Sequence, residues 1–175
     1  MATKEQIALD NDKRKLISHF NPKYTKIYEC PPNEGCICTL KFVMLVPSYV
    51  ATRHSITHNF VRKVIFYMDI LPNYPKTKPR VYYGNEQWPY HVNVYFTDMH
   101  PQCTDQYDPE NSNIIELAEK TARAVIFDPQ VRRFNSMASS TPEKWQRRME
   151  QKGELPTMNP ALLFNRNVKR VPHSS

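Results

Sequence analysis

Residues 60–84, FVRKVIFYMDILPNYPKTKPRVYYG, contain the pattern that decides the fold. Their first half alternates apolar with other residues, which is the period of a strand with one buried face made by Val64, Phe66, Met68 and Ile70. Three prolines follow within residues 71–79. Because proline cannot donate to a β-ladder or continue a helix, we expect a rigid extended crossover there. Residues 80–84 are then expected to form a further short strand.

An earlier strand is expected at residues 36–46, CICTLKFVMLV. Every second residue from Cys38 to Val46 is apolar, and Pro47 closes the segment. Residues 48–59 are polar and show no period, so we expect an irregular connection between the two strands.

An N-terminal helix is expected over residues 3–20. Thr3 can cap it and Pro22 ends it, with Ile7, Asn11, Arg14 and Ile17 at helical spacing. Its polar surface is mostly basic. This surface is either an ordinary solvated face or a docking face for an acidic partner, made by Lys4, Lys13, Arg14 and Lys15.

Two helices are expected later in the chain. Residues 112–127 carry an amphipathic stripe of Ile114, Ile115, Leu117, Ala118, Thr121, Ala122, Val125 and Ile126. Asp128-Pro129 ends this helix. Thr141-Pro142-Glu143 has the composition of a helix start, and the helix is expected to run to Gly153. Residues 154–175 contain three prolines and a basic end, and are expected to form a C-terminal tail with an apolar clip at Leu162, Leu163 and Phe164.

The segment between strands and helices, residues 85–111, shows no period over its whole length. A loop of this length in a compact domain is usually functional, and this one contains His91, Asn93, His100, Cys103 and Asp105. The order of elements predicts an α+β fold with an antiparallel sheet. We expect one domain at residues 1–153 followed by the tail at 154–175.

Composition excludes several function classes. The 175 residues include only three glycines, too few for the glycine-rich loops that bind nucleotide phosphates. The net charge of +7 favours acidic partners, either nucleic acid or an acidic protein face. No apolar run of about 18 residues could span a membrane, and the N-terminus lacks a secretory core. We therefore expect a cytoplasmic protein with no membrane partner.

The three cysteines other than Cys103 allow two interpretations. The spacings of Cys30, Cys36 and Cys38 with His54 and His58 are compatible with zinc. However, Cys38 belongs to the apolar face of its expected strand, which favours ordinary core cysteines. No metal and no other cofactor is expected.

Five segments stand in a suggestive order: ILPNYPKTKPRVYY (70–83), HVN (91–93), Cys103, ARAVIFDPQ (122–130) and TPEKWQRRMEQ (141–151). This order resembles the ubiquitin-conjugating enzymes, and the resemblance covers residues 3–152. It implies a ubiquitin-conjugating-enzyme-like domain with an N-terminal helix, an antiparallel meander sheet, a long active-site loop and C-terminal helices.

The resemblance also implies a chemistry. Cys103 would accept a ubiquitin-like protein as a thioester from an activating enzyme and transfer it to an amine, usually lysine, of a target protein. Asn93 would support the loop or stabilise the oxyanion, and His91 would be structural. Asp128 would help the attacking lysine to lose its proton. The basic first helix would dock the activating enzyme.

The sequence departs from the family at five places. Val92 replaces a proline, Cys103 follows Asn93 by ten residues, and Lys76 replaces an aromatic residue used for ligase docking. HSITHNFVRK (54–63) stands where the family has a Gly-Pro and Gly-Gly stretch, and only Tyr107-Asp108-Pro109 could match the family's serine-proline loop. A ligase partner of the usual kind is therefore doubtful. The pattern resembles a divergent branch, such as the bacterial ubiquitin-like conjugation systems of antiviral defence operons.

Three alternatives remain open. The domain could be a catalytically inactive scaffold of the same fold. It could be a basic nucleic-acid binder that stacks bases on Tyr82, Tyr83, Tyr90 and Tyr95 beside Arg80, although most basic residues lie elsewhere in the sequence. His100 could activate the Cys103 thiolate as in a cysteine protease, although such pairs are usually distant in sequence.

Overall fold

The computed structural model describes residues 1–165, and its centre is a four-stranded antiparallel sheet with the order β1-β2-β5-β6. The strands are β1 (Thr25–Cys30), β2 (Cys38–Met44), β5 (Val64–Ile70) and β6 (Arg80–Tyr83). The apolar faces predicted for β2 and β5 are both buried, so the prediction of an antiparallel sheet is confirmed. β1 was not predicted, because its inward positions include the polar Thr25 and the exposed Glu29.

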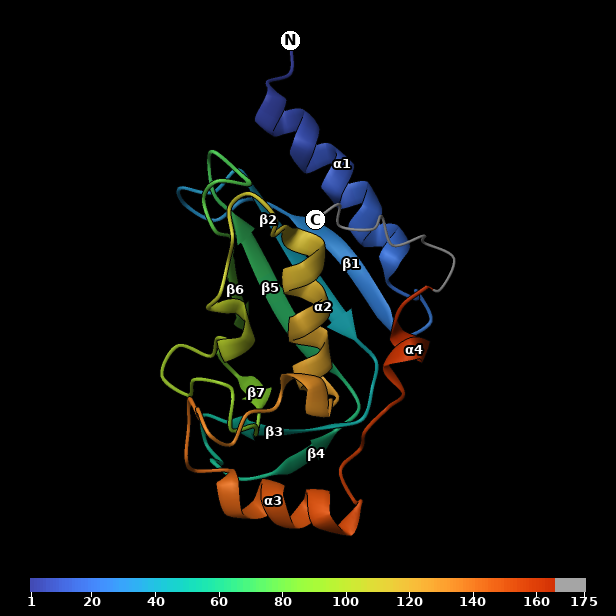
Figure 1. Cartoon of the computed structure of the whole chain (residues 1–175), viewed down its shortest axis with the longest axis vertical. Helices are drawn as coiled ribbons and strands as arrows, with labels where there is room; N and C mark the ends of the chain where they lie inside the picture. The colour runs from blue at the N-terminus through green and yellow to red at the C-terminus, as the bar shows by residue number, and fades with distance from the viewer. Residues whose placement is uncertain (166–175) are drawn as a thin grey trace.

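A second sheet lies beside the first and has the order β4-β3-β7 (Figure 1). Its strands are β3 (Ser48–Thr52), β4 (Asn59–Val61) and β7 (Gln87–Pro89). The prediction that residues 48–59 are irregular was therefore wrong. These strands are short and show no apolar period; β3 pairs with the neighbouring β4 and with the distant β7. The Ser48 hydroxyl also donates to the carbonyl of Val125 at 2.7 Å.

Helix α1 (Lys4–His19) begins at Thr3, whose side chain accepts a hydrogen bond from the N–H of Gln6 as predicted. The residues noted at helical spacing do not mark its inward face. Leu9 and Leu16 are buried, whereas the side chains of Ile7 and Ile17 point to solvent. Leu9 and Leu16 are seven residues apart and share one side of the helix, on which Phe20 extends the apolar contact with the core.

Helix α2 (Ile114–Val125) crosses one face of the four-stranded sheet (Figure 1). Its predicted stripe is buried, apart from the half-buried Ile115. Asn113 caps its start, and Phe127, with a left-handed φ of 53°, ends it. Helix α3 (Glu143–Lys152) lies at the opposite end of the molecule from α1 (Figure 1). The helix starts after Pro142 with no side-chain cap, so Thr141 does not act as predicted.

The chain returns to the core after α3. Helix α4 (Pro160–Leu163) buries Leu163 completely, and Phe164 pairs with Phe20 in a β-bridge. The predicted clip is therefore present at Leu163 and Phe164, while Leu162 is 46% exposed. The last part of the predicted tail, residues 166–175, lies outside the described residues.

Candidate functional site

The long loop 85–111 folds back on itself and contains, besides β7, the 3₁₀ helix η1 (Gln102–Thr104), on which Cys103 lies. Val94 and Pro101 form a bridge, and the N–H of Gln102 donates to the carbonyl of Asn93 at 2.8 Å. These backbone bonds bring Asn93 next to η1, although Gln102 lies nine positions further along the chain.

Cys103 and Asn93 line one pocket of about 210 Å³. The loop that follows α2 forms another wall of this pocket, through Gln130, Val131, Arg133 and Ser136. Lys120 of α2 lines it as well. Two of the four residues predicted to form the site therefore share a pocket, and the other two, His91 and Asp128, do not line it.

The Cys103 thiol is half-buried, and burial raises its pKa to about 12. The nearby Lys120 ammonium lowers this pKa and the Asp105 carboxylate raises it. Only the thiolate is a strong nucleophile. Cys103 is thus protonated in the free protein at neutral pH, and any reaction must include the removal of this proton.

The side-chain amide of Asn93 is fully engaged and is 3% exposed. Its Nδ2 donates to Gln102 Oε1 at 2.8 Å and to the carbonyls of Arg133 and Ser136 at 3.0 and 3.1 Å. Its Oδ1 accepts from the N–H of Arg133 at 2.5 Å. Asn93 therefore ties η1 to the loop after α2. The resemblance implied two possible roles for Asn93, support of the loop or stabilisation of the oxyanion, and these hydrogen bonds are of the kind that supports a loop.

His91 is completely buried. Its Nδ1 accepts from the N–H of Asn93 at 2.9 Å, which leaves the ring proton on Nε2. That Nε2 has no hydrogen-bond partner among the described residues. Burial, helped by the charge of Arg132, lowers the pKa of His91 to about 3. The ring is therefore neutral and orients the backbone before Asn93.

Asp128 is buried and held at both carboxylate oxygens. Oδ2 forms an ion pair with Arg123 at 2.6 Å, and Oδ1 accepts from the N–H of Gln130 at 3.0 Å. It caps the short 3₁₀ helix η2 (Pro129–Val131), which leads into the pocket wall. Its carboxylate is directed at these partners rather than into the Cys103 pocket.

The basic residues predicted to dock a partner divide into two kinds. Lys4, Arg14 and Lys15 are exposed on α1. Lys13 is 19% exposed and pairs with Glu29 of β1 at 3.2 Å and with Asp10 at 3.7 Å. Lys13 therefore links α1 to the sheet, whereas the other three side chains are exposed to a partner.

The features behind the metal and nucleic-acid alternatives do not come together. No group of three or more metal-ligating side chains occurs within residues 1–165. Cys36 lies before β2 rather than on it and accepts a hydrogen bond from Arg80. Of the four tyrosines suggested for base stacking, Tyr83 and Tyr90 are buried, and Tyr95 stacks on His100.

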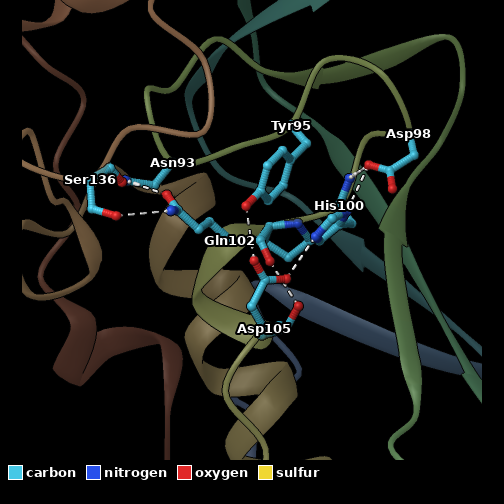
Figure 2. A network of polar contacts seen from close by, with 9 residues as sticks. Asn93, Tyr95, Asp98, His100, Gln102, Asp105 and Ser136 are labelled. Carbon is cyan, nitrogen blue, oxygen red and sulfur yellow. Dashed lines mark hydrogen bonds and ion pairs between the residues drawn. The ribbon is translucent and has the colours of Figure 1, made fainter.

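Sequence reasoning missed a polar network on the other side of η1 (Figure 2). The His100 ring lies between two carboxylates, with Nδ1 at 2.6 Å from Asp98 and Nε2 at 2.8 Å from Asp105. The Tyr95 hydroxyl donates to the other oxygen of Asp105 at 3.0 Å. The grouping of these four residues close to Cys103 in the sequence was the available signal, but their spacing does not reveal which of them meet.

Comparison with known proteins identifies no relative, because the chain matches neither a protein-family model nor a curated protein. Within the described residues, no helix combines the length and apolarity needed to cross a membrane.

Proposed function

We propose that this protein is a ubiquitin-conjugating-enzyme-like transferase that carries a ubiquitin-like protein as a thioester on Cys103. The observation that carries this proposal is the shared pocket of Cys103 and Asn93, with the Asn93 side chain bonded to Gln102 and to the backbone of Arg133. The α+β fold, with its N-terminal helix, antiparallel sheet and C-terminal helices, is consistent with it.

The reaction has two steps. In the first, the Cys103 sulfur attacks the C-terminal carbonyl of the modifier on an activating enzyme, and the activating enzyme's thiol leaves. In the second, an amine of the target attacks the new thioester, the C–S bond breaks, an amide forms, and Cys103 recovers its proton. A thiol suits both steps because it is a good nucleophile when ionised and a good leaving group.

The other site residues support these steps in different ways. Asn93 fixes the pocket wall beside Cys103, and His91 fixes the backbone that presents Asn93. Asp128 holds the start of the same wall through η2. Lys120 is the cation near the thiol, and its charge favours the thiolate during charging.

The partners follow from the surface. The exposed Lys4, Arg14 and Lys15 of α1 form a basic face suited to an acidic surface of the activating enzyme. Lys76, in place of a docking aromatic, argues against a ligase of the usual kind. We place the protein in the cytoplasm, in a bacterial ubiquitin-like conjugation pathway of the antiviral type.

The test is a charging assay. The full chain is incubated with ATP and a panel of ubiquitin-like proteins, each with its own activating enzyme, and is read by intact mass and non-reducing gels. We expect a reductant-labile adduct on the wild type and on the control Cys36→Ser. Cys103→Ser should give a hydroxylamine-labile ester, and Cys103→Lys a stable amide. An adduct that persists in Cys103→Ala contradicts the proposal, as does the absence of an adduct with every active set.

One observation favours the scaffold alternative. Burial keeps the Cys103 thiol protonated at neutral pH, as expected of a cysteine that does no chemistry. A scaffold would bind the ubiquitin-like protein or the activating enzyme without forming an adduct, and its binding would be unchanged in Cys103→Ala. The charging assay separates the two functions.

A further inference from the structure

Positive charge is concentrated at the end of the molecule opposite α1, on the β3–β4 hairpin (residues 48–63) and helix α3 (Figure 1). The hairpin contains three basic residues and no acidic one, and α3 contains four basic and two acidic residues. These two segments, which we call the α3–β4 surface, carry +5 of the net charge of +7. None of their residues lines the Cys103 pocket, so the proposed transfer chemistry does not account for this charge.

The charge on α3 is directed to solvent along one row. Both acidic residues of the helix are engaged, since each forms an ion pair with an arginine. Lys144, Arg148 and Lys152 follow one another at intervals of four residues, so they lie one above the other along the helix. All three are exposed, and none of them forms an ion pair within residues 1–165. The row is therefore an uncompensated line of positive charge.

Aromatic rings lie beside this row. His58, Phe60 and Arg62 alternate along β4 and the residues next to it, and so share one face of the small sheet. Tyr49 of β3 stands opposite Phe60 in the register, and the two rings meet edge-on at 5.5 Å. The His58 ring stacks at 5.0 Å on Trp145 of α3. The aromatic face of the sheet therefore adjoins α3.

Two of these rings are open to a ligand. Phe60 is 50% exposed, and His58 is exposed although it covers Trp145. The Arg62 guanidinium lies 5.3 Å from the centre of the Phe60 ring, which adds a cation at the ring itself. Exposed rings can stack on any nucleic-acid base, because every base has a π-face, while neighbouring cations attract the phosphates.

We infer that the α3–β4 surface binds single-stranded nucleic acid: the two exposed rings stack on bases, and the basic row of α3 contacts phosphates. A single strand fits because its bases are free to stack on protein rings, whereas those of a duplex are already stacked. The surface contains none of the four tyrosines that the sequence suggested for base stacking. The site goes beyond the proposed function and is independent of Cys103.

The apolar groups of the surface favour nucleic acid over an anionic membrane, which the same charge would attract. A helix that lies in a membrane surface needs a free apolar face. The apolar side of α3 is already packed, since Trp145 is 7% exposed and Met149 contacts the core. Ile56 is the only large aliphatic side chain exposed on residues 48–63, and one such side chain buries too little area to hold a protein on a membrane.

The test is fluorescence anisotropy of the full chain with labelled oligo(dT), oligo(U) and a duplex, each of about 15 nucleotides. For Lys144→Gln/Arg148→Gln we expect binding of both single strands to weaken by about tenfold or more. The slope of log K against log salt should become shallower by about 1.4, because each lost phosphate contact contributes about 0.7 on a single strand. The matched control is Lys4→Gln/Lys15→Gln, which removes two exposed charges from α1 and should bind within about twofold of the wild type.

A second variant tests the stacking. Phe60→Leu keeps an apolar side chain but removes the ring, so single-strand binding should weaken by about fivefold or more while the salt slope stays unchanged. An abasic oligonucleotide offers no base to stack, and its binding should be the same for Phe60→Leu and for the wild type. Thermal melts of each variant confirm that the fold is kept.

Several outcomes would overturn the inference. Equal losses in the α3 and α1 double variants would show attraction by net charge alone, and normal binding in Phe60→Leu would show that no base stacks there. A duplex bound as tightly as the single strands contradicts it as well. Binding to phosphatidylserine vesicles without binding to oligonucleotides would assign the surface to a membrane, and binding to neither would leave it without either role.

These measurements are separate from those of the proposed function. They use no ATP, modifier or activating enzyme, so oligonucleotide binding is measured whether or not Cys103 can be charged. If the chain binds single strands through the α3–β4 surface but forms no thioester, the proposed function fails and the inference stands. If it forms the thioester but binds no single strand, the reverse holds.

Discussion

The side chain of Asn93 binds the backbone of Arg133 twice, forty residues further along the chain. Asn93 Oδ1 accepts from the N–H of Arg133, and Asn93 Nδ2 donates to its carbonyl. This pair of bonds connects the loop that carries Cys103 to the loop that follows α2. The two walls of the pocket are therefore held by one amide side chain.

Replacing Asn93 should loosen the pocket wall. Asn93→Ala removes four part-buried hydrogen bonds of a buried side chain, which should lower the free energy of unfolding by about 1–3 kcal/mol. Hydrogen exchange of residues 131–139 should become faster, as read by mass spectrometry. Asn135→Ala, on the exposed part of the same loop, is the control. Unchanged exchange in Asn93→Ala would show that Asn93 does not support this loop.

The buried His91 should make the fold sensitive to acid. Because its pKa falls from 6.5 to about 3 on folding, the unfolded chain binds a proton over this interval and the folded chain does not. Stability should therefore fall as the pH drops below 6.5, with a contribution of up to about 1.4 kcal/mol per pH unit.

The measurement is urea unfolding at pH 7.5, 6.5, 5.5 and 4.5. His91→Asn keeps an acceptor for the N–H of Asn93 but cannot titrate in this range, so its stability should depend less on pH than that of the wild type. The exposed His54→Asn should retain the wild-type slope. Equal slopes in His91→Asn and wild type would contradict the prediction.

Charge reversal on α1 should separate docking from stability. Arg14→Glu and Lys15→Glu change exposed residues, so we expect slower charging with an unchanged melting temperature. Lys13→Glu breaks the contact with Glu29 and adds repulsion, which should cost about 1 kcal/mol of stability. Charging rates and thermal melts are measured on each variant. A normal charging rate in the Arg14→Glu/Lys15→Glu double variant would show that these basic residues of α1 form an ordinary solvated face and dock no partner.

The segment after α3, which packs back on the core through α4, should contribute to the free energy of unfolding. Leu163 is completely buried, and Leu163→Ala should lower the free energy of unfolding by about 3 kcal/mol through lost burial and a cavity. The neighbouring Leu162→Ala, at a position 46% exposed, should cost less than about 0.5 kcal/mol. Urea unfolding measures both. Equal effects would show that this segment does not pack as described.

Periodicity predicted the elements that bury a regular apolar face. The alternation predicted for β2 and β5 and the apolar stripe predicted for α2 agree with the buried residues, because each residue's burial is set by its place in its own strand or helix. The same method did not identify the inward face of α1, where Leu9 and Leu16 face the core while Ile7 and Ile17 are exposed. It also failed for β3 and β4, which pair with each other and, through β3, with the distant β7, and which show no apolar period.

The sequence by itself determined the α+β class, the antiparallel sheet, and the placement of Cys103 and Asn93 in one long loop. Those features follow from local period, proline positions and residue type. Only the tertiary structure decided which polar groups meet: Asn93 with Arg133, Asp128 with Arg123, and Asp105 with His100. The hydrogen bonds of Asn93 and the burial of Asp128 depend on where the chain returns after the sheet and α2 have packed. The contacts of His100 with Asp98 and Asp105 depend on how the loop folds back on itself. Neither the return of the chain nor the folding of this loop produces a period in the sequence.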